Sequence, residues 1–282
     1  MKIVITGGSG RVGKYVIEDL KKNGYEITVF DFKKPFINDV RFIKGNMMNI
    51  GDCRKAVKGS DVIVHLAAIP SVDINNPPEK VFNVNVGGTF NIFQAAVDMK
   101  IKKIVQTSSQ CAFGSYLSLS KKIKPLYLPM DENHPQNPSD AYSLSKKISE
   151  EIGEFFTKNY NIKTIMLRIG IVYNAWAGSK ASFEEELDIG TGLFWWYNFG
   201  EDVAQAVRLS IEGKNLEKYE VFNISASDNG TRLNSIELIK KKCGNNVTFI
   251  KKITGRESLC DYTKAIKLLG YCPQFSWKDS IK

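Results

Sequence analysis

The sequence predicts an α/β protein built on a doubly wound parallel sheet, with a small C-terminal substrate lobe. Three observations point to this fold. Short apolar runs alternate with amphipathic stretches through the first 170 residues. A glycine-rich turn follows the first run directly, and the alternation ends after about residue 170. Strands that are apolar on both faces and separated by helices form a parallel sheet with helices on each side.

The elements follow in order along the chain. Six apolar runs have the length of buried strands, and they are Lys2–Thr6, Glu26–Phe30, Val40–Ile43, Asp61–Leu66, Lys102–Thr107 and Lys163–Leu167. The intervening apolar residues recur at helical spacing over Val12–Lys22, Pro78–Met99 and Ala141–Asn159. Beyond residue 170 the pattern predicts a helix over Gly200–Glu212, a strand over Val221–Ser225, and helical pieces near Ser235–Lys242 and Asp261–Leu269.

The composition is that of an ordinary folded chain. Its 282 residues are 43% hydrophobic and 24% charged, which fits one large α/β domain and excludes a disordered or collagen-like chain. No apolar run approaches the roughly 18 residues that cross a membrane, and no secretory signal is visible. Five widely spaced cysteines without a C-x-x-C pair predict reduced thiols in the cytoplasm. With only His65 and His134 present, we expect no metal site.

The net charge of +9 is concentrated at the C-terminal end. Residues 240–282 carry ten Lys or Arg against three Asp or Glu, a net +7. Such a segment is either a solvated surface or a basic rim that attracts an anion. We expect no nucleic-acid partner, and we expect Lys180, Arg168 or Arg232 to be the cation that reaches a substrate pocket.

The glycine-rich turn spans Thr6–Gly13 and reads T-G-G-S-G-R-V-G. It follows a predicted strand and opens a predicted helix, which is the context of a dinucleotide site. Gly7 permits the tight turn, Gly10 lets the backbone approach a pyrophosphate, and Gly13 lets the helix pack closely. The phosphates are expected at the positive N-terminal end of the helix.

Asp31 ends the second predicted strand, about 20 residues after the glycines. A carboxylate there accepts hydrogen bonds from the adenosine ribose hydroxyls and repels a 2′-phosphate, so we predict NAD as the cofactor. Lys33, Lys34 and Arg11 are nearby cations that offset part of this repulsion.

Tyr142 and Lys146 lie four residues apart on a predicted helix, so they share one face. A phenol titrates near pH 10, and a close ammonium group lowers that pKa. Tyr142 is therefore the predicted base for a substrate hydroxyl, and Lys146 is expected to hold the nicotinamide ribose. Ser109 follows a predicted strand at the carboxyl edge of the sheet, where its hydroxyl is placed to orient the substrate oxygen.

Together with these residues, further motifs resemble the extended short-chain dehydrogenases/reductases, the NAD-dependent epimerase/dehydratase family. The motifs are Gly45–Met47, His65–Ala68, Asn83–Val86 with Gly88-Thr89, Ser108-Ser109, Tyr142-x-x-x-Lys146 and Lys264–Pro273. The resemblance covers nearly the whole chain. It implies a Rossmann NAD-binding domain over residues 1–168 and a small substrate lobe over residues 169–282, interleaved with the last sheet elements.

The resemblance also implies further cofactor-binding positions. They are Arg11, Val12, Asn46, Met47, Leu66, Ala67, Ala68, Asn85 and Ile169, in addition to Gly7, Gly10, Gly13, Asp31, Tyr142 and Lys146. Asn46 and Met47 are expected near the adenine, although the family usually has Asp where Asn46 stands. Ala67 and Ala68 are expected to line the cofactor cleft, and Asn85 to fix the backbone around the active site.

Local features narrow the branch of the family. The dehydratases carry an Asp-Glu pair where this chain has Gln110-Cys111, so it lacks their general acid. Cys111 is expected either near the substrate or as a small buried residue. We place Gln110, Cys111, Ser71 and Trp176 at the substrate. Trp176, together with Trp195–Tyr197, either stacks on a sugar ring or fills the lobe core.

The predicted lobe is short for a nucleotide-sugar enzyme. Only residues 171–200 separate the Arg168–Gly170 segment from the helix that carries Asp202. Glu201 replaces the usual Arg there and would repel a diphosphate. A short lobe resembles uronate dehydrogenase, but no Arg stands between Val172 and Ser182 to hold a carboxylate.

Three functions follow from this pattern. The first is an NAD-dependent oxidoreductase for a small sugar, sugar acid or polyol, with a Ser-Tyr-Lys catalytic set. The alternative is an NAD-dependent nucleotide-sugar epimerase similar to UDP-glucose 4-epimerase. The third is a non-catalytic NAD-binding regulator, against which the intact catalytic set argues. Phe93, Ile152, Phe155 and Phe156 give Pro78–Met99 and Ala141–Asn159 apolar faces beyond what the sheet should cover, and they predict a homodimer, because in the family these helices pair across a two-fold axis.

Overall fold

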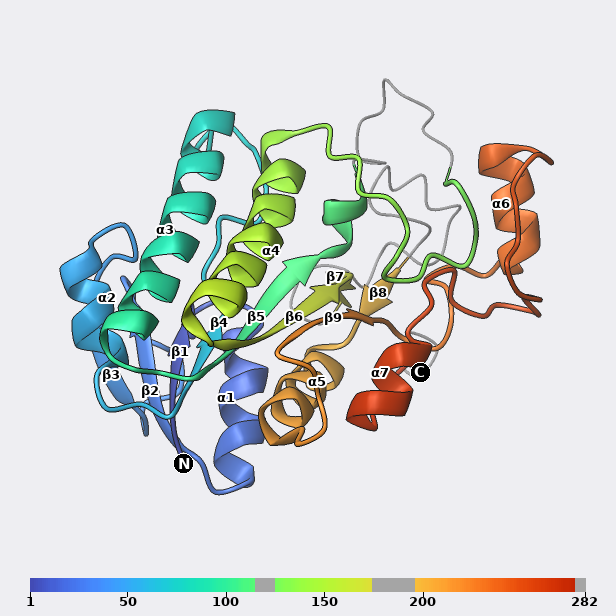
Figure 1. Ribbon diagram of the computed structural model, residues 1–282. Helices are drawn as coiled ribbons and strands as arrows, with labels where there is room; N and C mark the ends of the chain where they lie inside the picture. The colour runs from blue at the N-terminus through green and yellow to red at the C-terminus, as the bar shows by residue number, and fades with distance from the viewer. Residues whose placement is uncertain (115–124, 174–195, 277–282) are drawn as a thin grey trace.

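The computed structural model describes residues 1–114, 125–173 and 196–276 of the chain. A seven-stranded sheet with the order β3-β2-β1-β4-β5-β6-β9 lies at its centre, and every neighbouring pair is parallel (Figure 1). The strands are β1 (Lys2–Thr6), β2 (Glu26–Asp31), β3 (Arg41–Lys44), β4 (Val62–His65), β5 (Lys103–Ser109), β6 (Lys163–Ile169) and β9 (Tyr219–Ile224). The predicted doubly wound α/β fold is confirmed.

Seven helices were found in the described residues. They are α1 (Gly13–Lys22), α2 (Ile50–Val57), α3 (Pro78–Asp98), α4 (Ala141–Tyr160), α5 (Gly200–Glu212), α6 (Ser235–Cys243) and α7 (Thr263–Leu269). The sequence did not predict α2, nor the 3₁₀ turn η1 (Gln110–Phe113), nor the short parallel pair β7 (Ile171–Val172) and β8 (Tyr197–Asn198). The other elements differ from the predicted bounds by two residues or fewer at each end.

Apart from α6, the described helices form one layer on each face of the sheet (Figure 1). Alternate residues of a strand point to opposite faces, so Ile3 and Ile5 join one core while Val4 joins the other. The first core contains residues of α1, α5 and α7, and the second contains residues of α2, α3 and α4. Both faces of the sheet are therefore buried, which accounts for strands that are apolar throughout.

The strand register brings the carboxyl ends of the strands into line. Ser109 at the end of β5 pairs with Ile169 of β6, and Ile169 pairs with Ile224 of β9. On the other side, β1 lies between β2 and β4, so the sheet order reverses direction at β1. Ligands of open α/β sheets bind outside the carboxyl ends of the strands, at such a reversal.

A third apolar cluster lies where η1, Trp196 and α6 meet. Trp196 is 2% exposed and its Nε1 donates to the Ile224 carbonyl at 2.7 Å, while Tyr197 is 4% exposed. The predicted alternative that these two rings stack on a sugar is therefore wrong, because both rings are buried in the protein. Trp176 and Trp195 lie outside the described residues.

Several cations of the basic C-terminal segment are paired with carboxylates. Lys251 lies 3.1 Å from Asp261, Arg256 lies 2.7 Å from Asp228, and Lys264 lies 2.6 Å from Glu220. Two of these pairs connect the segment to residues outside it, Asp228 and Glu220 of β9, and the third joins two residues of the segment itself. Among the described helices, none is both long and apolar enough to span a membrane.

Candidate active site

The glycine-rich turn connects β1 to α1 at the carboxyl edge of the sheet. Gly7 has φ +71°, and a Cβ there would lie 2.6 Å from the Ala67 backbone. A Cβ on Gly13 would lie 2.2 Å from the Gly8 carbonyl oxygen, and one on Gly10 would lie 3.1 Å from the Gly7 oxygen. Side chains are thus excluded at Gly7 and Gly13 and crowded at Gly10, which leaves the backbone of the turn and the start of α1 to face a ligand.

Asp31 ends β2 beside this turn. Its two carboxylate oxygens accept hydrogen bonds from the backbone N–H groups of Ser9 at 3.1 Å and Lys33 at 3.2 Å. The Ser9 hydroxyl also donates to the Lys33 carbonyl at 2.5 Å. These bonds fix the carboxylate at the edge of the turn, where the sequence predicts the adenosine ribose. The glycine cradle and this acceptor fit a bound dinucleotide.

The predicted adenine positions lie in the loop between β3 and α2. Asn46 is exposed, and its side-chain oxygen accepts from the Met48 backbone at 2.9 Å. Met47 is half-buried and packs under Gly88 of α3. The remaining predicted cofactor positions share the carboxyl edge of the sheet: Leu66, Ala67 and Ala68 follow β4, Arg11 and Val12 precede α1, and Ile169 ends β6.

Asn85 links the β4–α3 loop to helix α4 and is 2% exposed. Its side-chain oxygen accepts from the Ile69 N–H at 2.8 Å, and its amide donates to the Ile69 carbonyl and the Ser145 hydroxyl, both at 3.0 Å. The Ser145 hydroxyl in turn donates to the Tyr142 carbonyl at 2.7 Å. This side chain therefore fixes the loop after β4 against the turn of α4 that carries Tyr142.

Ser109, Tyr142 and Lys146 come together where β5 ends against α4. The ammonium group of Lys146 donates to the Thr107 carbonyl at 3.1 Å and lies 5.8 Å from the centre of the Tyr142 ring. The Ser109 side chain forms a hydrogen bond with Tyr142. The Ser109 oxygen also accepts from the Cys111 N–H at 3.1 Å, which sets its orientation. The three predicted catalytic groups thus share one site.

The pKa of Tyr142 is shifted in the direction opposite to the one expected from the sequence. Burial raises the pKa of its phenol and the nearby Cys111 adds to this, while the hydrogen bond with Ser109 lowers it. The sequence predicts the opposite direction, because it takes the Lys146 charge as the main influence. Burial also lowers the pKa of Lys146, to about 8, so the enclosed site weakens both charged forms.

Two neighbours of Lys146 are uncharged near neutral pH. His65 is 1% exposed and lies between the hydroxyls of Thr6 and Thr89, at 2.6 and 3.2 Å. Burial, followed by the charge of Lys146, lowers the pKa of His65 to about 3. Burial raises the pKa of Cys111 to about 11. Cys111 is accordingly a buried thiol beside Ser109.

The predicted substrate residues differ in burial and in location. Gln110 is 3% exposed, and no partner of its side-chain oxygen was found within the described part of the chain. Ser71 is exposed in the loop between β4 and α3. Trp176 lies outside the described residues. Gln110 and Cys111 therefore adjoin Ser109 of the predicted catalytic set, and Ser71 lies on the surface of a loop at the same edge of the sheet.

Arg168 is not a free cation for a substrate. Its Nε and Nη2 donate to the two carboxylate oxygens of Glu150, at 3.0 and 2.8 Å, and both side chains are 6% exposed. Its Nη1 donates to the Glu132 carbonyl at 3.0 Å. The proposed pocket role of Arg168 is therefore wrong, because Glu150 neutralises it. Arg232 is exposed, and Lys180 lies outside the described residues.

Sequence reasoning missed Glu150, although a signal for it existed. Tyr142, Lys146 and Glu150 are spaced by four and share one face of α4. Ser108, adjacent to Ser109, donates its hydroxyl to Glu150 at 2.5 Å. The spacing of four is the signal that places this carboxylate on the same helix face as Tyr142 and Lys146.

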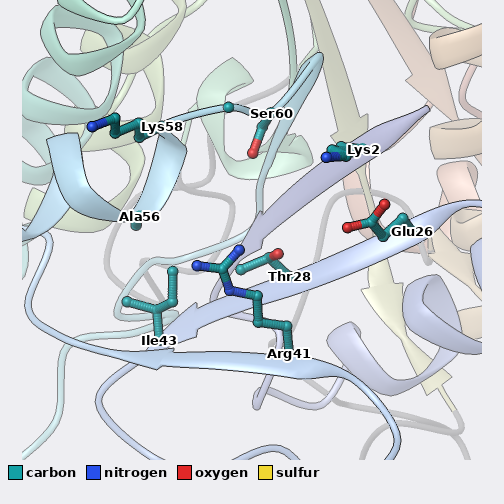
Figure 2. A pocket seen from close by; sticks show the side chains of 9 residues that line it. Lys2, Glu26, Thr28, Arg41, Ile43, Ala56, Lys58 and Ser60 are labelled. Carbon is teal, nitrogen blue, oxygen red and sulfur yellow. The ribbon is translucent and has the colours of Figure 1, made fainter.

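A separate cavity of about 340 Å³ lies at the opposite ends of the strands (Figure 2). Lys2, Glu26 and Arg41, which are the first residues of β1, β2 and β3, line it together with Lys58 and Ser60. These ends are the amino ends of parallel strands, whereas Gly7, Asp31 and Ser109 follow the carboxyl ends. The cavity is therefore not part of the candidate site.

Comparisons with known proteins agree with this geometry. Residues 3–187 match the NAD dependent epimerase/dehydratase family. A putative UDP-glucose 4-epimerase of Methanocaldococcus jannaschii is 27% identical, over 99% of this chain and 96% of that protein. An L-arabinose 1-dehydrogenase (NAD(P)(+)) of Haloferax volcanii is 26% identical, over 80% of this chain and 89% of that protein.

A solved structure shares the fold. The UDP-glucose 4-epimerase of Thermotoga maritima, crystallised with UDP-glucose, superposes with a TM-score of 0.73 at 23% identity, covering 100% of this chain and 96% of that one. The matched residues hold the glycine turn, Asp31 and the Ser109, Tyr142 and Lys146 set. The chain belongs to the NAD dependent epimerase/dehydratase family, with NAD as its cofactor.

Proposed function

We propose that the chain is an NAD-dependent dehydrogenase of a small free sugar, sugar acid or polyol. The observation that carries this proposal is the meeting of Ser109, Tyr142 and Lys146 at the carboxyl end of β5, on the same edge of the sheet as the glycine turn. These are the groups that oxidation of a hydroxyl requires: a base, a cation and a donor to the substrate oxygen.

Each side chain has a distinct role in this proposal. Bound NAD supplies the hydride acceptor. Tyr142 removes the proton of the substrate hydroxyl, and Ser109 donates a hydrogen bond to the same oxygen. Lys146 provides positive charge beside the phenolate and holds the nicotinamide ribose. Gln110 follows Ser109 in the sequence, and its side-chain oxygen is buried. In this proposal that oxygen accepts a hydrogen bond from a second substrate hydroxyl.

The size of the lobe favours a small substrate. Only residues 170–199 separate β6 from α5, and the first turn of α5 carries an acidic pair, Glu201 and Asp202. We propose residues 169–282 as the substrate lobe and residues 1–168 as the NAD-binding domain. Glu201 would repel the diphosphate of a nucleotide sugar, which argues for a free sugar.

A screen of NADH formation tests this function. Free pentoses, hexoses, uronates and polyols are supplied with NAD, and absorbance at 340 nm is followed, with UDP-glucose and UDP-galactose in parallel. Tyr142→Phe is the matched control for activity from contaminating enzymes. Reduction of NAD by a free sugar supports the proposal. Turnover of a UDP-hexose without turnover of any free sugar contradicts it.

The alternative is a nucleotide-sugar epimerase. The observation that favours it is the similarity to the Methanocaldococcus jannaschii protein along 99% of the chain. An epimerase must keep its reduced cofactor between two half-reactions, so it is expected to purify with NAD bound. Protein that purifies free of nucleotide and exchanges NAD at micromolar or weaker affinity favours the dehydrogenase.

We also propose a homodimer formed through α3 and α4, in the cytoplasm. Phe93 and Phe156 belong to the core and are wrong as members of this face, whereas Phe90, Phe155 and Tyr160 are 42–48% exposed around the Phe156 ring. Such an aromatic face on two adjacent helices is typical of an interface. Light scattering of the wild type and of Phe155→Glu tests it, with a dimer mass expected for the first and a monomer for the second. All five cysteines are free thiols, which supports a reducing compartment.

A further inference from the structure

His65, the last residue of β4, connects the first strand of the sheet to helix α3. Its Nδ1 lies 2.6 Å from the hydroxyl of Thr6, which is its register partner on β1, and its Nε2 lies 3.2 Å from the hydroxyl of Thr89 on α3. All three residues are at most 2% exposed. The protein itself therefore has to satisfy the hydrogen bonds of these buried groups.

The surroundings of Thr6 decide which ring nitrogen of His65 carries the proton. The Thr6 oxygen accepts from the Ala67 N–H at 3.4 Å, and among the described residues the ring of His65 is the one acceptor for the Thr6 hydroxyl hydrogen. If Nδ1 were protonated, two donors would point at Thr6 and its own hydrogen would be buried without a partner, at a cost in free energy. Thr6 therefore donates to Nδ1, and the proton of neutral His65 is on Nε2.

The partners of Thr89 are consistent with this tautomer. With Nε2 protonated, His65 donates to the Thr89 oxygen, which also accepts from the Gln106 amide at 3.5 Å. The Thr89 hydroxyl can then donate to Ser149, 3.5 Å away, and the Ser149 hydroxyl donates to the Ser145 carbonyl at 2.7 Å. Each hydroxyl hydrogen in this row thus has an acceptor, and the row ends on α4.

Thr6 also contacts both loops that form the predicted cofactor cleft. It lies directly before the glycine turn, and a Cβ on Gly7 would lie 2.6 Å from the Ala67 backbone. The Thr6 oxygen bonds the Ala67 N–H on one side and the His65 ring on the other. A ring held at both nitrogens therefore fixes the hydroxyl that keeps the glycine turn against the loop after β4.

We propose that His65 is a positioning residue for NAD, fixed as the tautomer with its proton on Nε2. It holds the Thr6 hydroxyl, and Thr6 in turn sets the spacing between the glycine turn and the Ala67 loop. His65 acts through Thr6 rather than by contact with the cofactor. NAD binding precedes both an oxidation and an epimerisation, so this role does not depend on which reaction the chain catalyses.

Nitrogen NMR tests the tautomer. The chain has two histidines, so long-range proton–nitrogen correlations of the rings give two patterns, which His65→Gln or His134→Gln assigns. His134 is an internal reference of the opposite kind, because its Nε2 accepts from the Leu126 N–H at 3.0 Å and its Nδ1 donates to the Pro135 carbonyl at 3.1 Å. Burial lowers the pKa of His65 to about 3, so its ring is neutral at pH 7. There we expect the proton on Nε2 of His65, and a proton on its Nδ1 overturns the proposal.

Calorimetry of NAD binding tests the positioning role. Thr6→Val removes the hydroxyl and keeps a branched side chain, and we expect it to raise the Kd of NAD about tenfold, the order of one lost hydrogen bond. Thr164→Val is the matched control, because Thr164 of β6 is 0% exposed and no partner of its hydroxyl was found within the described residues. This control should change the Kd by less than about twofold.

A double variant shows whether Thr6 and His65 act through the same contact. Thr6→Val with His65→Phe should bind NAD within about twofold of His65→Phe alone, because both changes break one hydrogen bond. Circular dichroism checks the fold of every variant, and if His65→Phe does not fold, the comparison of Thr6→Val with Thr164→Val decides. Equal NAD affinity of these two threonine variants, or a further tenfold loss in the double variant, overturns the proposal.

Discussion

Breaking the buried pair of Glu150 and Arg168 should destabilise the protein far more than breaking an exposed pair. In Arg168→Met, the carboxylate keeps its donors Ser108 and Gln136 but loses two charge-assisted bonds, and the Glu132 carbonyl loses its donor. An uncompensated buried charge costs about 3–5 kcal/mol. We expect the free energy of unfolding to fall by that amount.

The matched control lies on the same helix. Lys158 and Glu154 of α4 are 2.6 Å apart, closer than Arg168 and Glu150, but their side chains are 69% and 42% exposed. Water screens such a pair, so Lys158→Met should cost less than about 1 kcal/mol. The comparison separates the effect of burial from that of distance.

The assay is urea unfolding followed by circular dichroism, on Arg168→Met, Glu150→Leu, the double variant and Lys158→Met. The double variant removes both charges, so we expect it to lose at least about 2 kcal/mol less than the sum of the two single losses. Equal costs for Arg168→Met and Lys158→Met, or strictly additive single losses, would refute the reasoning.

Four further predictions concern the candidate site and the first turn of α5. Tyr142→Phe should lower kcat by ~100- to 10,000-fold with little change in NAD affinity by calorimetry, as for loss of a general base. Asp31→Ser should shift the ratio of kcat/KM for NADP over NAD about tenfold toward NADP, because it removes a charge that repels a 2′-phosphate. Gly13→Ala should lower both NAD affinity and stability, by about 1–3 kcal/mol in urea unfolding, since a Cβ would lie 2.2 Å from the Gly8 oxygen. Burial raises the pKa of Asp202 to about 6, so stability should fall by up to ~3 kcal/mol as pH rises from 4 through 6, and Asp202→Asn should flatten that slope in urea midpoints.

The sheet and its site could be predicted because their signals are local. Strands such as Val62–His65 are buried on both faces, so an unbroken apolar run identifies them without knowledge of the tertiary structure. The glycine turn is equally local, since Gly7 and Gly13 are required by backbone contacts within a few residues or with the adjacent strand. Helix α2 was missed because it is only eight residues long, although Asn49 caps it by accepting from Asp52.

The parts that failed depend on neighbours distant in sequence. Nothing in the sequence shows that Arg168 of β6 pairs with Glu150 of α4, 18 residues earlier. Arg168 could therefore be interpreted as a cation that contacts the substrate. Aromatic residues such as Trp196 and Tyr197 occur both where a protein stacks on a sugar and in apolar cores. Only their packing in the folded chain shows that these two belong to apolar clusters.

The parallel register explains why stability and chemistry share side chains here. Ser108 and Arg168 are paired residues of β5 and β6, so their side chains project to the same face and both reach Glu150 on α4. Arg168 and Glu150 cancel in charge, which leaves the positive charge of Lys146 in excess at the strand end. A phenolate formed at Tyr142 would balance that charge. The charge of Lys146 at the strand end thus favours the phenolate of Tyr142, which is the form that accepts the proton of a substrate hydroxyl.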